Sequence, residues 1–338
     1  MNKNNETTQI NKQTLYKIPV WFKLSCMTIS RAKSGKYKLT KKDTKNGYYL
    51  TLTFEGINLK VPFSALFDTN NKLDGIPSIS FSTAKDCPSQ KLGLCQLIDN
   101  NLCYALRGEK QANGIYTDRG FLKLNSYYKT VLDMEFIKTI KTNSKQLNKL
   151  YEYINANFEV VRFNKKGDFK NREDYLFLIS MVLNCPNTNF YGYTARDNLF
   201  KDFEFNKTPN NFYLNGSNKM YTNWFITTTN LKDYLNSGYK CLGDCPRCKK
   251  CHTLQKKVIK CLLHGSNTDM YFNTFDNRDF LITFFNNNFK GLNLSHRDLK
   301  TNKGLLSSLN KAFKNSMYKE WNFKDYKELT NYIYAMGW

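Results

Sequence analysis

The fold is decided by residues 159–193, which read EVVRFNKKGDFKNREDYLFLISMVLNCPNTNFYGY. The two ends of this stretch, 159–163 and 189–193, are short apolar and aromatic runs that are typical of buried strands. Between them, 171–184 begins with an Asn that can cap a helix, continues with early acidic residues and ends in an apolar stripe. A strand, a helix and a second strand in this order predict one βα unit of a parallel sheet.

Similar short runs recur on both sides of this unit, so it is one of several. Strands are predicted at 78–82, 159–163, 189–193, 212–214, 224–228 and 258–263, and helices at 103–112, 127–157 and 171–184. Strands that alternate with helices are the pattern of a repeated βα unit. The predicted fold class is therefore α/β, a partial (βα) barrel of about six mostly parallel strands.

The chain outside this repeat predicts two appendages. Residues 1–72 form a basic, β-rich N-terminal unit, in which 47–63 alternate like a two-stranded hairpin that is marginal alone and packs on the body. Residues 73–266 form the α/β core, which holds two groups of cysteines. Residues 267–338 are polar and aromatic with periodic stretches, so we expect a helical C-terminal region.

The charge balance is strongly basic, with 51 Lys and Arg against 28 Asp and Glu and a formal net charge of +23. A field of this sign collects polyanions, so nucleic acid, DNA or RNA, is the expected partner. The alternative is a general lysine bias spread evenly over a solvated surface. The sequence has no apolar run long enough to span a membrane and no signal peptide, so we expect no membrane partner and a cytoplasmic location.

Four of the ten cysteines lie within eleven residues, in CLGDCPRCKKC at 241–251. In a reducing compartment, thiols that cluster in this way bind metals instead of forming disulfides. Cys241, Cys245, Cys248 and Cys251 would close a tetrahedral zinc site or hold a [4Fe-4S] cluster, and the spacing leaves both open. His252 and His264 are alternative ligands that could replace one cysteine.

A second group, Cys87, Cys95 and Cys103, directly follows the predicted strand 78–82. Three thiolates on a loop between a strand and a helix could hold a four-iron cluster with one iron open to a ligand. They could also hold zinc with water or a fourth protein ligand. The remaining alternative is that these are buried structural cysteines, since free Cys is among the most buried residue types.

Polar residues also follow the central predicted strands, at the edge where parallel sheets gather their chemistry. Asp168 and Asp197 are candidates for a general base or a nucleophile. Arg162 or Arg196 could clamp a carboxylate or a phosphate. Asn164 is a further candidate, since it lies between Arg162 and Asp168 in the sequence. The alternative is ordinary capping of the helix that follows each strand.

Several ordered motifs together are similar to a known family: CPSQKLGLCQ, CYALRG, VVRFNKKGDF, FYGYTARDNL, YLNGSN and CLGDCPRCKKC followed by LLHG. In this order they resemble the phage gene-product-88-like proteins over about residues 78–266. A phage origin implies the host cell cytoplasm. The strand followed by a cysteine loop ending in Cys-Tyr-Ala is also similar to radical S-adenosylmethionine proteins, although the cysteine spacing differs and no Gly-Gly-Glu segment follows.

The radical S-adenosylmethionine resemblance implies a [4Fe-4S] cluster with S-adenosylmethionine at Cys87, Cys95 and Cys103. It also implies that Asn164 and Asp168 face the substrate. The expected function is a phage-type, metal-dependent enzyme that modifies nucleic acid, with a second, structural metal site at 241–251.

Two alternatives stay open. The late cysteines resemble, in order, the zinc site of tRNA-guanine transglycosylases; the matching ligands are Cys245, Cys248, Cys251 and His264. That resemblance implies exchange of a guanine base of the 7-deazaguanine type in DNA or RNA, with Asp168 and Asp197 as base and nucleophile. The other alternative is a non-catalytic zinc protein that binds nucleic acid through its basic N-terminal unit.

Overall fold

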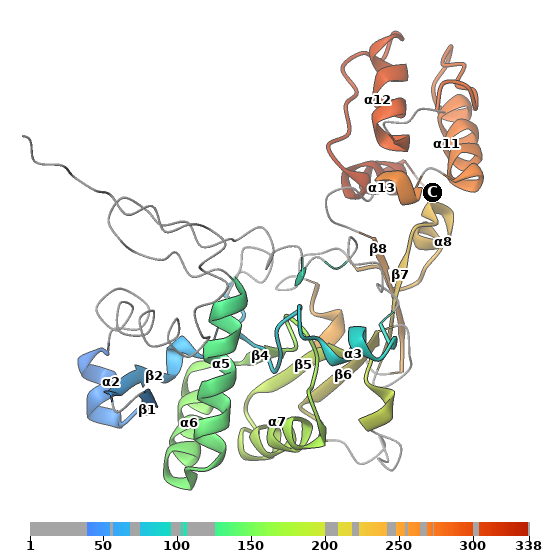
Figure 1. The fold of residues 1–338 in the computed structure, drawn as a ribbon. Coiled ribbons are helices and arrows are strands. Elements are labelled where there is room, and N and C mark those ends of the chain that lie inside the picture. The colour runs from blue at the N-terminus through green and yellow to red at the C-terminus, as the bar shows by residue number, and fades with distance from the viewer. Residues whose placement is uncertain are drawn as a thin grey trace, which may run out of the picture.

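A computed structural model gives the fold (Figure 1). It describes residues 39–54, 57–67, 75–95, 103, 105–106, 126–199, 209–217, 223–241, 248–253, 256–263, 269–272, 274–299 and 304–336.

The centre of the molecule is a six-stranded sheet whose strands are all parallel and adjacent in chain order. The strands are β3 (Ser78–Ile79), β4 (Val160–Phe163), β5 (Asn189–Thr194), β6 (Phe212–Ser217), β7 (Asn223–Thr228) and β8 (Val258–Leu262). All six predicted strands are confirmed in position. The first is shorter than the predicted 78–82, because beyond Ile79 the serine at 82 bonds to the main chain of Asp168 through its side chain.

Three long helices pack at one side of the sheet (Figure 1). They are α5 (Ser126–Lys141), α6 (Ser144–Asn157) and α7 (Arg172–Asn184). The helical stretch predicted at 127–157 is confirmed and is divided into α5 and α6 at Asn143, which caps α6 by accepting a hydrogen bond from the Gln146 amide. The helix predicted at 171–184 is confirmed, with Asn171 as its cap. Most of the helix predicted at 103–112 lies outside the described residues.

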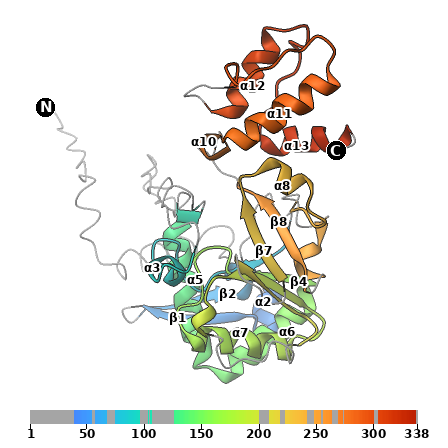
Figure 2. The same ribbon diagram turned by 90° about the vertical axis from the view of Figure 1, so that its right-hand side faces the viewer.

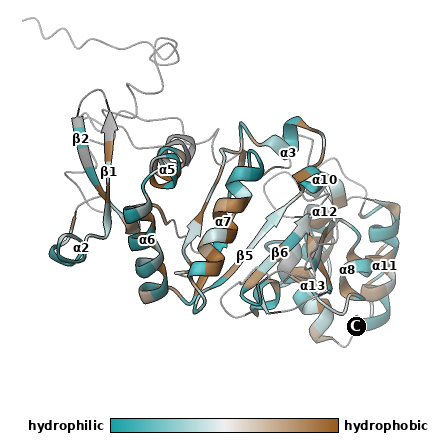
Figure 3. Cartoon of the chain, turned by 90° about the horizontal axis from the view of Figure 1, so that it is seen from below, coloured by the Kyte–Doolittle hydropathy of each residue, from teal (hydrophilic) through white to brown (hydrophobic). Residues whose placement is uncertain are grey.

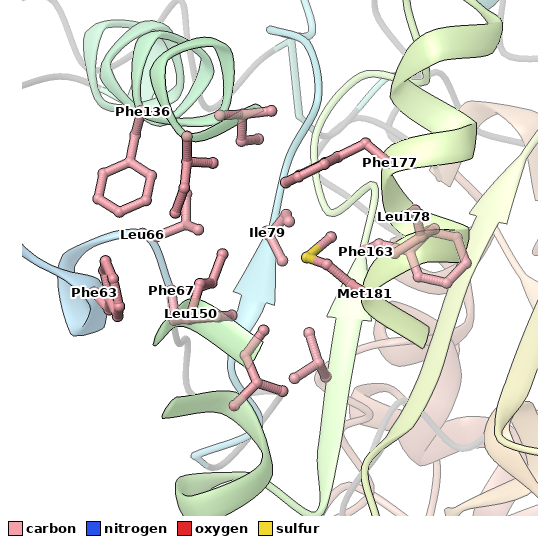
Figure 4. Packing of buried hydrophobic residues seen from close by; sticks show 14 of the residues in the cluster. Phe63, Leu66, Phe67, Ile79, Phe136, Leu150, Phe163, Phe177, Leu178 and Met181 are labelled. Carbon is pink, nitrogen blue, oxygen red and sulfur yellow. The ribbon is translucent and has the colours of Figure 1, made fainter. Parts of the chain in front are cut away.

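The main hydrophobic core fills the space between these helices and the sheet (Figure 4). Phe163 of β4 and Met181 of α7 meet there, and Phe63 and Phe67 reach the same cluster from the N-terminal unit. Helices α6 and α7 each carry hydrophobic and hydrophilic sides, as expected for helices that cover a core (Figure 3).

The N-terminal unit consists of α2 (Lys41–Asn46), β1 (Tyr49–Phe54), β2 (Ile57–Pro62) and the short η3 (Phe63–Ala65). Strands β1 and β2 pair antiparallel. Their residues Leu50, Leu52 and Val61 belong to the main core, so this unit packs on the body as predicted.

The C-terminal part is helical and has its own core, stacked beyond β7 and β8 (Figure 2). Its elements are α8 (Leu231–Leu235), α10 (Asp269–Phe272), α11 (Phe275–Asn288), α12 (Leu305–Lys314) and α13 (Tyr326–Ala335). An ion pair between Lys260 and Asp233 joins β8 to α8. No described helix is long and apolar enough to cross a membrane.

Candidate functional site

The two faces of the sheet differ in chemistry. Val161, Phe163 and Phe190 point into the main core under the helices, so the alternate residues of the same strands point to the opposite face. Arg162 and Tyr193 lie on that opposite face, with the guanidinium of Arg162 5.2 Å from the centre of the Tyr193 ring. We call it the inner face and define it by Arg162, Tyr191, Tyr193, Tyr213 and Asn215.

Asp168 lies at the carboxyl ends of the parallel strands. Its hydrogen bonds link the segments at the ends of β3, β4 and β5. Its carboxylate accepts five hydrogen bonds: at Oδ1 from Asn164 Nδ2 (3.0 Å), Thr194 Oγ1 (2.8 Å) and the Phe169 amide (2.8 Å), and at Oδ2 from Ser89 Oγ (2.6 Å) and the Ala195 amide (2.9 Å). The main chain of Asp168 is held as well, since Ser82 Oγ accepts from its amide (2.8 Å) and donates to its carbonyl (2.6 Å).

This arrangement decides what Asp168 can do. A carboxylate offers about four lone-pair sites, and five protein donors already occupy them. Burial raises the pKa of Asp168, and the hydrogen bonds from Ser89, Ala195, Thr194 and Phe169 oppose that rise. The geometry favours a positioning role, in which Asp168 fixes the loop after β3 to the ends of β4 and β5.

The early cysteines lie on that fixed loop. Cys87 is the N-cap of α3 (Pro88–Lys91), and burial raises the pKa of its thiol to about 12, against the effect of amide hydrogen bonds from the first turn. Cys95 is close enough to contribute to that rise, and its amide donates to the Ser89 carbonyl (3.1 Å). Cys103 packs against a small cluster formed by Ala84, Ala105 and Leu106. Cys87 and Cys95 are therefore neighbours, and Cys103 lies beside the cluster that contains Ala84 of the same segment.

The polar groups after β5 have two different environments. Arg196 is buried, and its guanidinium donates to the carbonyls of Phe169 (2.6 Å) and Lys170 (3.1 Å) and to the Asn198 side chain (2.8 Å). It therefore ties the end of β5 to the segment that leads into α7. Asp197, in the short η4 (Asp197–Leu199), is exposed. Of the two aspartates predicted as catalytic candidates, Asp168 is therefore buried and hydrogen-bonded, and Asp197 lies on the surface.

The late cysteine segment 248–253 packs on the inner face. The Tyr193 hydroxyl donates to Cys251 Sγ (3.0 Å), and Asn215 Nδ2 donates to the Cys251 carbonyl (3.0 Å). Desolvation raises the pKa of Tyr193 well above its usual value, which keeps the phenol a hydrogen-bond donor. The His252 ring lies 5.0 Å from the Tyr191 ring, and neither of its nitrogens has a hydrogen-bond partner among the residues described.

The predicted metal ligands at 241–251 are placed only in part. Cys241 lies beside β8, since its amide donates to the Lys260 carbonyl (2.7 Å). Cys248 lies two residues before η6 (Lys250–His252), and Cys251 lies within it. Cys245 and His264 lie outside the described residues. Within the part of the chain that is described, no three Cys, His, Asp or Glu side chains form a group that could hold one ion.

Several residues of this site were not predicted. Ser82 and Ser89 supply key hydrogen bonds to Asp168. The polar alternation in the buried run SISFS could have indicated Ser82, because a buried serine needs a partner. No local signal marks Ser89. The role of Tyr193 as a donor to a cysteine 58 residues away depends on the tertiary fold alone.

Comparison with known protein families shows that the family model of gene product 88 matches residues 33–223. The chain belongs to the gene product 88 family. No curated protein and no solved structure matches it.

The match differs in extent from the resemblance over 78–266. It begins earlier and includes the N-terminal hairpin, and it ends at the first residue of β7. Within the gene product 88 region lie the early cysteines, Asp168 with its partners, and the inner-face residues Tyr193 and Asn215. The late cysteines and the C-terminal helices lie beyond it.

Proposed function

We propose that this gene product 88 protein is a metal-dependent enzyme that modifies nucleic acid, with an iron–sulfur centre at Cys87, Cys95 and Cys103 that works with S-adenosylmethionine. One observation carries the proposal. The cysteine loop follows the first strand of a six-stranded parallel sheet and is fixed by Asp168 to the ends of the next two strands.

The position of the loop supports this choice of site. Ligands of parallel α/β sheets bind outside the carboxyl ends of the strands. Six parallel strands in chain order also suit an incomplete barrel, and the radical S-adenosylmethionine resemblance places its cysteine loop after the first strand. Here β3 is that strand, and Asn164 and Asp168 follow the second.

The donor set suits iron. Thiolates are the ligands of iron–sulfur clusters, and three of them leave one iron open for S-adenosylmethionine. Thiolates around a cluster lie farther apart than thiolates around a single ion, so the proposal does not require the close trio that a lone ion needs. When bound, the cluster would supply one-electron chemistry. The protein would hold the early cysteine loop in place and keep water away from the carboxyl ends of the strands.

A second metal, zinc or a [4Fe-4S] cluster, is part of the proposal at Cys241, Cys245, Cys248 and Cys251. Its place just before the last strand suits a structural or auxiliary centre. The net charge of +23 supports DNA or RNA as the substrate. Guanine exchange ranks below iron–sulfur chemistry, because it needs a free carboxylate at Asp168 and five donors already occupy that group.

The test is the metal content of protein purified without oxygen. We expect a brown protein with about four irons per chain at the early site, with matching sulfide. Replacing Cys87, Cys95 and Cys103 by Ala should remove that iron and bleach the colour. Cys185→Ala is the matched control, because Cys185 is buried in the main core, and it should keep the iron. A colourless wild-type protein that holds only zinc would contradict the proposal.

A further inference from the structure

Lysines gather around the last two strands of the sheet. The described residues between 223 and 263 hold seven lysines and one acidic residue, Asp233. Within the described chain, only Lys260 among these lysines has a carboxylate partner, and that partner is Asp233. A zinc ion or a [4Fe-4S] cluster with four thiolates carries about two negative charges, so a metal centre would not offset this surplus. The seven are Lys232, Lys240, Lys249, Lys250, Lys256, Lys257 and Lys260.

One face of these strands joins the lysines to an exposed tryptophan. The register sets Trp224 of β7 opposite Val258 of β8, two residues before Lys260. A parallel bridge sets Lys240 opposite Lys260. Because alternate residues of a strand share a face, Trp224 and Lys240 lie on the same face, about 10 Å apart across two strand spacings. Trp224 is 36% exposed and is not among the residues of the described hydrophobic cores.

A second exposed ring lies over Lys240. The Lys240 ammonium is 4.7 Å from the centre of the Tyr334 ring, which is 59% exposed in the last turn of α13. Lys250 Nζ donates to the Lys240 carbonyl (3.3 Å), and Lys256 is exposed two residues before β8. The strands β7 and β8 extend toward α8, away from α6 and α7 (Figure 2). This face therefore carries two exposed rings with ammonium groups beside them.

The combination fits one class of polyanion. Lysine ammonium groups attract phosphates as point charges, and aromatic rings stack on bases of any sequence. In a duplex the bases already stack on one another, so their faces are closed to a protein ring. Only an unpaired strand would use the rings and the lysines together.

We propose that this basic face, defined by Trp224, Lys240, Lys250, Lys256 and Tyr334, binds single-stranded nucleic acid without sequence preference. The lysines hold the phosphates, and the two rings stack on bases. The inference deepens the proposed function, on which it rests for a nucleic acid substrate. It assigns the contact to the last two strands, beyond the residues that match gene product 88, and not to the basic N-terminal unit.

The experiment titrates a labelled oligo(dT) of about 15 nucleotides with the full-length protein, purified without oxygen, and follows fluorescence anisotropy at several salt concentrations. An unlabelled duplex of the same length is the competitor and should compete less well than the single strand. Replacing Lys240 and Lys256 together by Gln should weaken binding and reduce the salt slope by about 1.4, from about 0.7 for each phosphate contact. The matched control replaces Lys145 and Lys314, which are exposed on α6 and α12, and should keep the wild-type slope.

The rings are tested separately, because Trp224 and Tyr334 lie outside the cysteine segment 241–251. Trp224→Ala and Tyr334→Ala should each weaken binding about 5- to 100-fold. Tyr334→Phe should bind like the wild type, since a phenyl ring also stacks on a base. Phe275→Ala is the control, because it removes a ring of similar exposure (63%) at the start of α11, and it should leave the affinity unchanged.

Four results would overturn the inference. If the wild type binds oligo(dT) and both alanine variants of the rings bind it equally well, the inference is wrong while the proposed function stands. Equal weakening by the control pair of lysines would show that general charge holds the strand. A duplex that competes as well as the single strand would exclude the preference for unpaired bases. If the wild type binds neither, the nucleic acid part of the proposed function fails as well, and the iron content still tests the metal centre.

Discussion

The two cysteine regions are held in opposite ways. The early loop is fixed through neighbours of its cysteines, since Ser82 and Ser89 bond to Asp168 and, among the residues described, no hydrogen bond of Asp168 involves a sulfur. The late segment is held at the cysteine itself, because Tyr193 donates to Cys251 Sγ. The first arrangement fixes the loop through residues beside its cysteines, whereas the second makes a cysteine sulfur part of the packing.

The family match divides the same two regions. Both the early loop and its anchor, Asp168, fall inside residues 33–223. The late cysteines fall outside, although the inner-face residues that receive them, Tyr193 and Asn215, fall inside. Under the proposed function, the early region, which lies inside the matched residues, would carry the chemistry and the late segment would support it.

The largest expected effect is that of Asp168→Asn, which breaks the early anchor. An amide at this position would turn an NH₂ group toward donors that now meet a carboxylate oxygen. We expect the free energy of unfolding in urea to fall by about 3–5 kcal/mol. In the folded variant, iodoacetamide should modify Cys87 faster and Cys251 at the wild-type rate.

Asp197→Asn is the control for this change. Asp197 is an exposed aspartate close in sequence to the end of β5, and its replacement should alter stability by no more than about 0.5 kcal/mol. An Asp168→Asn protein as stable as the wild type would show that the five hydrogen bonds do not anchor the loop.

Gly167→Ala should give the next largest effect. An added Cβ would lie 2.2 Å from Ser82 Oγ and 2.6 Å from the carbonyl oxygens of Ser82 and Thr83, at φ +61°. We expect a loss of about 2–4 kcal/mol in urea unfolding. Gly93→Ala, at φ +67° in open space, tests backbone strain alone and should cost about 1 kcal/mol. Equal losses in the two variants would mean that the contact with Ser82 is not tight.

The sequence predicted the sheet better than the site. The positions of the strands follow from local apolar runs, and Asn171 marks the start of α7 as its N-cap. Both signals lie within a few residues of the element, so both could be predicted from the sequence. The roles of the aspartates could not, because Asp168 and Asp197 look alike in sequence. Only the fold brings Ser89, from 79 residues away, to saturate one of them. That Asn164 Oδ1 has no hydrogen-bond donor among the residues described is likewise a property of the packing around it and has no sequence signal.

Tyr193→Phe tests the late region with a smaller change. The variant loses only the hydroxyl that donates to Cys251 Sγ, so stability should fall by about 1 kcal/mol. In metal-free protein, mass spectrometry should show faster iodoacetamide labelling of Cys251 and unchanged labelling of Cys87. Tyr213→Phe removes a hydroxyl from the same face and should change neither rate. Labelling of Cys251 at the wild-type rate would show that the phenol does not hold the sulfur.

The smallest effect concerns the outer side of the early loop, where Asp86 accepts hydrogen bonds from Thr83 (3.0 Å) and from Lys91 (3.2 Å). Partial burial opposes the charge on Asp86, but these two partners outweigh it and lower its pKa below 3.8. The ionised group therefore contributes stability above pH 3.8, and that contribution is lost as the pH falls through the lowered value.

Asp86→Asn should accordingly cost less than about 1 kcal/mol at pH 7, because the pair with Lys91 is largely exposed to solvent. The difference from wild type should shrink as unfolding is measured at decreasing pH below 3.8, and added salt should reduce it at pH 7. Asp168→Asn should remain strongly destabilising at high salt, since its partners are buried. If added salt abolished the stability loss of Asp168→Asn as well as that of Asp86→Asn, Asp168 would not differ from Asp86 as a buried anchor differs from a surface ion pair.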